Sequence, residues 1–375
     1  MAWFSFIPYS RAMSENAETE AVLEDLRRGP RPLPAFVGMA GLFARSPEYR
    51  LRMIEGLKLY QSHPFRRPAT VDRIIWQDGT VTMRHIPAQG KRHLLLVPSM
   101  INRSVIMDLL PARSFARWLA ARGIDVYLID WGEPKDDSGQ QTLDDILHQK
   151  FLPSLLFLNE KTGGYDVLGY CMGGTLLAGV VHLKPEGLNK VIYLAAPWDF
   201  LAGGRELQQQ VLLGTPSALQ ITEQGGVLPS GWIQSVFAAV NAERNIHKFA
   251  DFAVMDQDSD QARLFVAVED WLNDGVDLPS ALARACVVDW YGQNKPAKGE
   301  WIVDGRAVDP ARTKNPVLVV TSSTDRLVPE ESSHALASMI PQARLLTSTC
   351  GHIGMMTGRR AQDEVWEPIA DWIVA

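Results

Sequence analysis

The feature that most restricts the fold of this chain is an alternation of short apolar runs with helical patterns. The apolar runs, which are typical of buried strands, cover residues 94–97, 126–129, 165–168 and 191–194, and later 317–321 and 344–347. Helical patterns follow them at residues 112–122, 143–158, 175–183, 331–339 and 363–373. Strands that alternate with helices predict a mostly parallel sheet with helices on both faces. We expect the helix of residues 143–158 to bend or break at Pro153.

The alternation stops between residues 198 and 312, where helical and irregular stretches show no strand–helix rhythm. We therefore expect residues 91–197 and 313–375 to form the sheet domain, and residues 198–312 to be an inserted cap. Residues 1–90 are expected to be an N-terminal extension built from helices and a hairpin.

Local signals define the elements of this extension. Ser14 is placed to cap a helix that ends near Arg28, and Ser46-Pro47 marks the start of a helix that runs to about Gln61. Asp78-Gly79 stands between two short apolar runs, 74–76 and 81–83, and indicates a hairpin turn.

Composition excludes several classes of function. The formal net charge of −6 argues against a nucleic-acid-binding protein, because such proteins usually present a basic face. The chain has three cysteines at wide spacing, which indicates neither a disulfide framework nor a zinc ribbon and favours a reducing, cytosolic compartment. No apolar run is long enough to predict a membrane-spanning helix.

The N-terminal stretch is aromatic and apolar, with Trp3, Phe4 and Phe6 close together. It has no basic region before it and no cleavage signal after it, so a signal peptide is not expected. Two interpretations stay open: the patch contacts a lipid or polymer surface, or it packs against the rest of the protein.

The sharpest motif is Gly169-Tyr170-Cys171-Met172-Gly173-Gly174, which follows a predicted strand and opens a predicted helix. It matches the G-x-S-x-G nucleophile elbow with cysteine in place of serine. In such a turn, side chains at the glycine positions would collide with neighbouring backbone, and the helix N-terminus stabilises the reactive thiolate. The alternative interpretation is a buried cysteine in a glycine-rich turn.

Two further residues follow in the order that an α/β-hydrolase requires, namely nucleophile, acid and histidine. Asp325 comes directly after the strand 317–321, and His352 comes after the strand 344–347. Taken singly, Asp325 could be a helix cap and His352 a loop histidine. Together with Cys171 they predict a catalytic triad on an α/β fold, with an α/β-hydrolase core, a mostly parallel sheet and an inserted cap domain.

An oxyanion needs two preorganised backbone donors. One is expected to be the N–H of Met172, the residue after the nucleophile. The other is expected in the loop after Val97, from Met100 or Ile101, and the sequence does not choose between these two.

Cysteine as the nucleophile indicates the kind of substrate. Moving an acyl group from a CoA thiol to Cys171 exchanges one thioester for another, so the acyl-enzyme stays reactive toward a second nucleophile. This favours acyl transfer from thioesters over simple ester hydrolysis, although some cysteine elbows belong to hydrolases.

From about residue 91 to the end, the chain resembles the polyhydroxyalkanoate synthases. The segments that carry the resemblance are the elbow 169–175, the stretch 97–103 with Asp108-Leu109, the stretch 125–132 with 142–145, Asp325 with Val328-Pro329, and 351–354.

The resemblance implies a polymerising acyltransferase that uses (R)-3-hydroxyacyl-CoA and releases CoA. Cys171 would hold the acyl group or growing chain as a thioester, and His352 would be the general base. Asp325 would orient His352 or help to activate the incoming 3-hydroxyl group. No metal and no redox cofactor are implied.

The resemblance also implies partners and a location. The chain is short, like the synthases that work with a second subunit, so either such a subunit or a homodimer is expected. The expected location is the cytoplasm, with the surface of a polymer granule as a further site.

Some residues depart from the family. Arg326 stands where many members have histidine, and the stretch 269–275 matches only a subset of synthase-like proteins. Two alternatives therefore stay open: a cysteine-dependent thioesterase or depolymerase, and a non-catalytic relative that binds granules or a partner. Cys350, close to His352, is either a small apolar filler or an oxidation-sensitive neighbour of the site.

Overall fold

The computed structural model describes residues 21–26, 28–33, 47–134, 141–204, 206–240 and 242–375. The chain divides into two compact units. The larger unit comprises Pro68–Ile233 and Gly275–Ala375, and the smaller one Met1–Arg67 and Gln234–Asp274. The aromatic patch at Trp3, Phe4 and Phe6, and the helix caps expected at Ser14 and Ser46, lie outside the described residues.

The larger unit is built on an eight-stranded sheet with the order β1-β2-β4-β3-β5-β6-β11-β12. Its strands are β1 (Arg73–Asp78), β2 (Val81–Ile86), β3 (Arg92–Val97), β4 (Ile124–Asp130), β5 (Tyr165–Tyr170), β6 (Leu188–Leu194), β11 (Val317–Ser322) and β12 (Ala343–Ser348). All neighbouring pairs from β4 to β12 are parallel, which confirms the predicted mostly parallel sheet.

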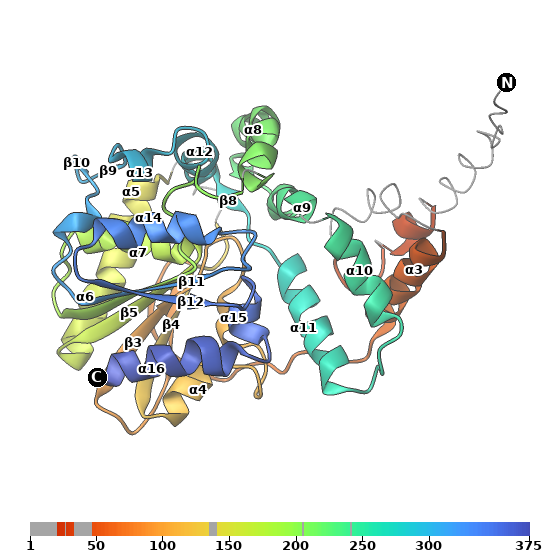
Figure 1. The fold of residues 1–375 in the computed structure, drawn as a ribbon, viewed down its shortest axis with the longest axis horizontal. Coiled ribbons are helices and arrows are strands. Elements are labelled where there is room, and N and C mark those ends of the chain that lie inside the picture. Colours follow the sequence, from red (N-terminus) through yellow and green to blue (C-terminus); the bar gives the residue numbers. More distant parts are fainter. Residues whose placement is uncertain (1–20, 27, 34–46, 135–140, 205, 241) are drawn as a thin grey trace. The chain divides into compact units, whose positions relative to one another are not determined.

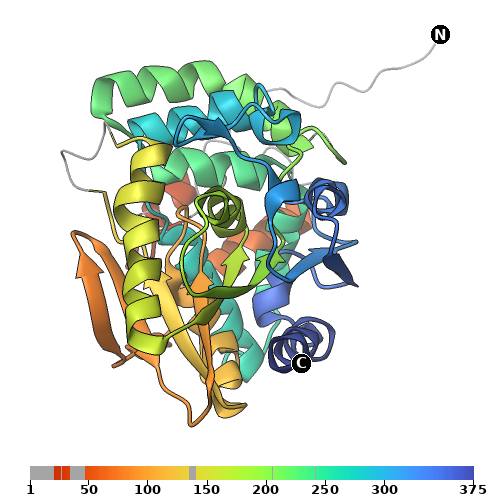
Figure 2. The same cartoon turned by 90° about the vertical axis from the view of Figure 1, so that its left-hand side faces the viewer.

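Helices cover both faces of this sheet. In Figure 1, α4 (Phe115–Ala121) and α16 (Glu367–Val374) lie on one face, and α6 (Leu152–Thr162), α7 (Met172–His182) and α14 (Glu330–Met339) lie on the other. The turned view in Figure 2 shows the same two layers. Because both faces are covered, every residue of β5 and β11 is buried, as the continuous apolar runs of these strands predict.

The helix predicted over residues 143–158 is continuous. It consists of α5 (Leu143–Ile146), a π-helical turn at Leu147–Phe151 and α6. Pro153 lacks an N–H, and it sits at the start of α6, directly after the wider turn. Of the expected bend or break at Pro153, the break is wrong, because the π turn before the proline accommodates it without ending the helix.

Further elements of the larger unit contact one another. They include α8 (Glu206–Gly225), α12 (Ser280–Arg284) and a π-helical turn at Ala285–Trp290. The remaining elements are η1 (Ser104–Asp108), β7 (Val227–Leu228), β8 (Leu278–Pro279), α13 (Lys295–Lys298), β9 (Ile302–Val303), β10 (Arg306–Ala307), η5 (Pro310–Arg312), α15 (Gly354–Thr357) and η6 (Gln362–Trp366). None of the helices described in the structure is both long and apolar enough to span a membrane.

The division into units differs from the expected domain boundaries in two places. The hairpin β1–β2, expected in an extension of residues 1–90, belongs to the main sheet, because β2 pairs with β4 and buries Val81, Met83 and Ile86. The expected cap of residues 198–312 is split, since Gln234–Asp274 belongs with the N-terminal residues.

The smaller unit is a helical cluster. The described residues 21–26 are helical, and the helix predicted from Ser46 to Gln61 is present as α3 (Pro47–Ser62). The others are α10 (Ala242–Phe252) and α11 (Asp260–Asn273), and α9 (Ser230–Val240) spans the boundary between the units. Leu57, Tyr60, Phe249 and Phe252 are fully buried in its apolar core.

A buried arginine ties the N-terminal segment to α11. The side chain of Arg31 is 3% exposed, pairs with Asp270 and donates to the carbonyl oxygens of His63 and Phe65. Tyr60 also donates its hydroxyl hydrogen to Asp270, at 2.9 Å. The acidic stretch 269–275 therefore has a structural role in this unit, because Glu269 likewise pairs with Lys248.

The substitution Asp270→Asn is expected to lower the free energy of unfolding by about 2–3 kcal/mol, because it leaves the buried Arg31 guanidinium without a counter-charge. Urea denaturation followed by circular dichroism measures this loss. Asp260→Asn on the same helix is the control, since the Asp260 side chain is 99% exposed and its ion pair with Arg263 lies at the surface. Equal stabilities of the two variants would contradict the assignment.

Candidate active site

Cys171 occupies the tight turn between β5 and α7. Its backbone has φ 56° and ψ −130°, an uncommon conformation for a residue other than glycine. The turn is fixed on both sides, because the N–H of Cys171 donates to Leu194 O at 2.9 Å and its carbonyl accepts from the N–H of Gly174 at 2.8 Å. The surrounding structure therefore holds the nucleophile in a strained position at the carboxyl end of the sheet.

The glycines around Cys171 are required by close backbone contacts. A Cβ atom on Gly169 would lie 2.6 Å from Gly174 Cα, and one on Gly174 would lie 2.4 Å from Ala196 Cβ. A Cβ atom on Gly173 would lie 2.3 Å from Val97 O and 2.5 Å from Pro98 O. The elbow thus packs directly against the end of β3, where the loop with Met100 and Ile101 begins.

His352 and Asp325 form a direct contact, with 2.6 Å between His352 Nδ1 and Asp325 Oδ2. The Asp325 side chain is fully buried, and its other oxygen, Oδ1, accepts from the N–H groups of Leu327 and Val328 at 2.8 and 2.9 Å. The two interpretations of Asp325 are therefore compatible, because one oxygen stabilises the turn while the other holds the histidine.

The electrostatics of His352 match the role of a base that receives a proton. Burial lowers the pKa of His352, but Asp325 and Cys171 raise it by charge attraction and hydrogen bonding, and the net result is a pKa well above the ordinary histidine value. The electrostatics of the His352 ring are therefore coupled to both Asp325 and Cys171.

Tyr170 positions His352, and the sequence analysis missed it. The two rings stack with centroids 5.1 Å apart, and the Tyr170 hydroxyl donates to the His352 carbonyl at 3.1 Å. Its place next to Cys171 in the elbow is the signal that could have suggested it.

Tyr291 is a second residue that the sequence did not reveal. Burial raises the pKa of its phenol, and the nearby Cys171, Cys286 and Asp325 raise it further, so the hydroxyl stays protonated. Its ring packs edge-on against Phe200, which also stacks on Trp290.

The expected oxyanion donors lie on the two backbone segments that meet at Gly173. Met172 is the first residue of α7, so its N–H has no acceptor within the helix. On the other segment, the N–H of Ile101 already donates to Ser99 Oγ at 3.1 Å, and the Ile101 carbonyl accepts from Val276 at 2.8 Å.

The environments of the other two cysteines, Cys286 and Cys350, favour the protonated thiol. Burial raises the pKa of Cys286 to about 12, and burial together with nearby Glu364 raises the pKa of Cys350. The Cys350 sulfur faces Glu364 at 3.9 Å, and its N–H donates to Ser348 Oγ. Among the described residues, no group of three or more His, Cys, Asp or Glu side chains could hold a metal ion.

Comparison with known proteins assigns the family. A model of the alpha/beta hydrolase fold matches residues 93–359, and the chain belongs to this family. This confirms the fold class expected from the sequence.

Within the family, the similar curated proteins are poly(3-hydroxyalkanoate) polymerase subunits named PhaC, which confirms the resemblance seen in the sequence. The protein of Haloferax mediterranei is 29% identical over 81% of this chain, that of Haloarcula marismortui is 28% identical over 86%, and that of a Synechocystis species is 29% identical over 75%. The matches span 63%, 70% and 77% of those proteins, respectively.

The substitution Gly173→Ala is expected to destabilise the protein by roughly 1–3 kcal/mol, because the new methyl group overlaps two carbonyl oxygens of the β3 end. It should also slow alkylation of Cys171 by iodoacetamide, since the elbow has to shift. Urea denaturation and the alkylation rate measure the two effects. Gly225→Ala is the control, because no heavy atom lies within 4 Å of its Cβ position; equal effects of both variants would refute the packing argument.

The raised pKa of His352 predicts a pH dependence. Since its pKa is higher in the folded protein than in the unfolded chain, protonation of His352 stabilises the fold. This contribution is complete below the unfolded pKa and is lost as the pH rises through the folded pKa. Titration of labelled histidine rings by NMR, with His352→Gln for assignment, should show a raised pKa that falls in Asp325→Asn.

The variant Asp371→Asn, at an exposed position of α16, is the control for this titration and should leave the pKa of His352 unchanged. An unperturbed pKa in the unsubstituted protein, or no fall in Asp325→Asn, would contradict the assigned ion pair.

Proposed function

We propose that this chain is an acyltransferase that polymerises (R)-3-hydroxyacyl-CoA into polyhydroxyalkanoate and releases CoA. The observation that carries the proposal is the arrangement of His352 between Asp325 and a strained, elbow-mounted Cys171. The polymerase names of the curated relatives supply the substrate class. A thiol nucleophile fits a thioester substrate, because the acyl group passes between two sulfur atoms of similar reactivity.

In the proposed reaction, His352 accepts the proton of the Cys171 thiol, and the sulfur attacks the thioester carbonyl of the substrate. The tetrahedral intermediate collapses, the bond to the CoA sulfur breaks, and CoA leaves with the proton returned by His352. The acyl group then remains on Cys171 as a thioester. Asp325 orients His352 and stabilises its protonated form.

The acyl group then moves to a second nucleophile. The 3-hydroxyl group of another hydroxyacyl unit attacks the thioester carbonyl, His352 takes the hydroxyl proton, and an ester bond replaces the thioester. The restored Cys171 thiol regains that proton. One CoA is released for each hydroxyacyl unit that is loaded.

The proposed oxyanion donors are the N–H of Met172 and the N–H of Met100. Met172 heads α7, where the helix dipole favours negative charge. Met100 is preferred to Ile101 because the Ile101 N–H is already occupied by Ser99 Oγ.

The proposal extends to partners and location. Either a second synthase subunit or a second copy of this chain completes the active enzyme. The insoluble product makes the surface of a cytoplasmic polymer granule the expected place of action.

Incubation of the purified protein with (R)-3-hydroxybutyryl-CoA tests the proposal through the release of free thiol. Cys171→Ala should reduce CoA release by about 10³-fold or more, because no covalent intermediate can form. Cys350→Ala is the matched control and should keep its activity, since Cys350 contacts Glu364. The product should be insoluble polyester.

Other results would change the assignment. Release of CoA with only free hydroxyacid would identify a thioesterase. Release that is equal in Cys171→Ala would refute the assigned nucleophile. If no CoA is released, addition of a candidate partner subunit decides between an incomplete enzyme and a non-catalytic protein.

A further inference from the structure

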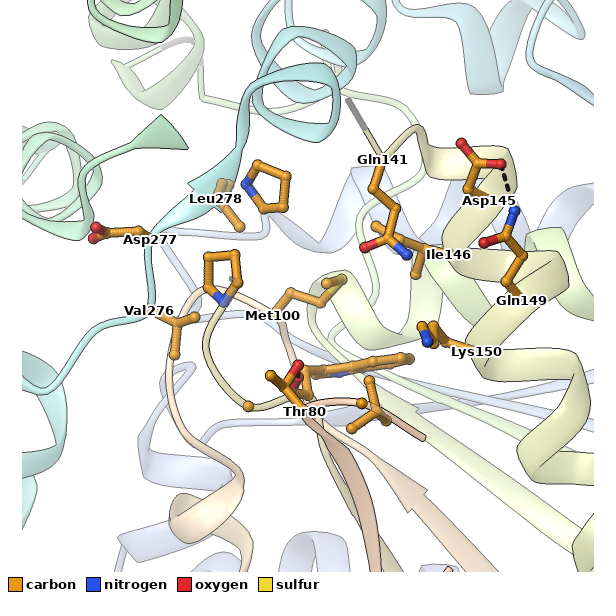
Figure 3. Close-up of a pocket in the computed structure, with 16 residues that line it drawn as sticks. Thr80, Met100, Gln141, Asp145, Ile146, Gln149, Lys150, Val276, Asp277 and Leu278 are labelled. Carbon is orange, nitrogen blue, oxygen red and sulfur yellow. Dashed lines mark hydrogen bonds between the residues drawn. The ribbon is translucent and has the colours of Figure 1, made fainter. Parts of the chain in front are cut away.

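The two sides of the candidate site are built differently. On the side of the proposed oxyanion donors, the side chain of Met100 points into a cavity of about 470 Å³ (Figure 3). On the side of the base, the chain that leads to His352 is instead fixed by side-chain hydrogen bonds. Several of these bonds go to one residue, Glu364, to which the triad gives no role.

Glu364 lies in the π-helical turn η6 and binds the end of β12 with both of its carboxylate oxygens. Its Oε2 atom accepts from the N–H of Thr349 at 2.7 Å and from the Ser348 hydroxyl at 3.0 Å. The Thr349 hydroxyl lies 2.8 Å from Oε2 and 3.0 Å from Oε1. Arg360, four residues earlier, pairs with Oε1 at 3.2 Å. The carboxylate thus holds two successive residues shortly before His352.

Ser348 extends this contact to a third residue. Its hydroxyl donates to Glu364, while the same Oγ atom accepts from the N–H of Cys350 at 2.9 Å. Cys350 therefore takes part through its backbone, which Cys350→Ala keeps, and its sulfur lies farther from the carboxylate, at 3.9 Å. Only Gly351 separates this fixed segment from His352, so a shift of the segment is passed on to the imidazole.

The same segment is bonded to the loop that carries Asp325. The carbonyl oxygen of Ser348 accepts from the N–H of Ser323 at 3.1 Å. The carbonyl oxygen of Thr349 accepts from the Thr324 hydroxyl at 2.9 Å. The η6 carboxylate binds the N–H and hydroxyl groups of the segment, and the Asp325 loop binds its carbonyl groups. These bonds together fix the spacing of the two loops that supply the acid and the base.

The turn η6 also holds the chain after His352. The indole N–H of Trp366, a buried residue, donates to the carbonyl oxygen of Met355 in α15 at 2.8 Å. Glu364 and Trp366 of one turn therefore bind the chain on both sides of His352. Wide turns of this kind are rare and frequently occur at functional sites.

The hydrogen-bond pattern requires an ionised carboxylate. The backbone N–H and the hydroxyl of Thr349 lower the pKa of Glu364, so the group is charged at neutral pH. A carboxylate only accepts hydrogen bonds, and the N–H, hydroxyl and guanidinium groups around it are all available as donors. A glutamine amide has nearly the same size but directs its own two donors at these donors. Glu364→Gln therefore disturbs the network without leaving a cavity.

We propose that Glu364 is a positioning residue for the base His352. Its carboxylate holds the end of β12 against the Asp325 loop, and so keeps the imidazole in contact with Asp325 and directed at Cys171. The inference rests on the roles that the proposed function gives to Cys171 and His352. Glu364 acts through the chain, and no bond of the reaction is made or broken at it.

The substitution Glu364→Gln is expected to slow alkylation of Cys171 by iodoacetamide about tenfold, because a displaced base no longer serves the thiol. Peptide mass spectrometry follows this alkylation separately from that of the other cysteines. In the same variant, NMR titration should show the raised pKa of His352 moving toward the ordinary histidine value. Asp363→Asn, at an exposed position of η6, is the matched control and should change neither quantity.

A second pair of variants tests the same contact if Glu364→Gln does not fold. Thr349 is exposed, so its substitution is tolerated more readily. Thr349→Val removes the hydroxyl contacts with the carboxylate and keeps the N–H bond, and it should slow alkylation several-fold. Thr349→Ser keeps the hydroxyl and should restore the rate. Equal rates in these two variants would count against the proposal.

Neither alkylation nor NMR requires a substrate, so the outcomes separate the two proposals. If the unsubstituted protein releases no CoA and makes no polymer, the proposed function fails, while alkylation and NMR still decide the role of Glu364. If Glu364→Gln matches Asp363→Asn in both quantities, the inference alone is overturned. Lower stability of Glu364→Gln in urea would not rescue it, because a merely structural role changes stability and leaves the pKa of His352 in place.

Discussion

The contact on which the active site depends is the one between Gly173 and the carbonyl oxygens at the end of β3. Only a hydrogen atom fits at this position, so the start of α7 and the loop after Val97 meet at backbone distance. That contact places the N–H of Met172 beside the loop that carries Met100. It also explains why Cys171 accepts a strained backbone, since the hydrogen bonds to Leu194 and Gly174 hold the turn on its other side.

Strand register places the other two residues of the site. β11 and β12 are parallel and pair residue for residue up to Ser322 and Ser348, so the loops that follow begin at the same edge of the sheet. Asp325 and His352 lie in these two loops and meet at 2.6 Å. The buried carboxylate of Asp325 keeps two backbone donors as well as the histidine, and this compensates for its removal from water.

Local signals explain what could be predicted from the sequence. The strands, the elbow glycines, Asp325 and His352 are each marked by short patterns or by chain order, and the structure has them at the expected places in the fold. The non-local features had no such signal. Arg31 meets Asp270 across 239 positions, and one ion pair leaves no periodic pattern to detect. The pairing of β2 with β4 and the stacking of Tyr170 on His352 likewise depend on tertiary contacts.

The proposed reaction needs opposite treatment of the two parts of its substrate. CoA is a polyanion that must leave after every transfer, whereas the acyl chain must stay until the next unit arrives.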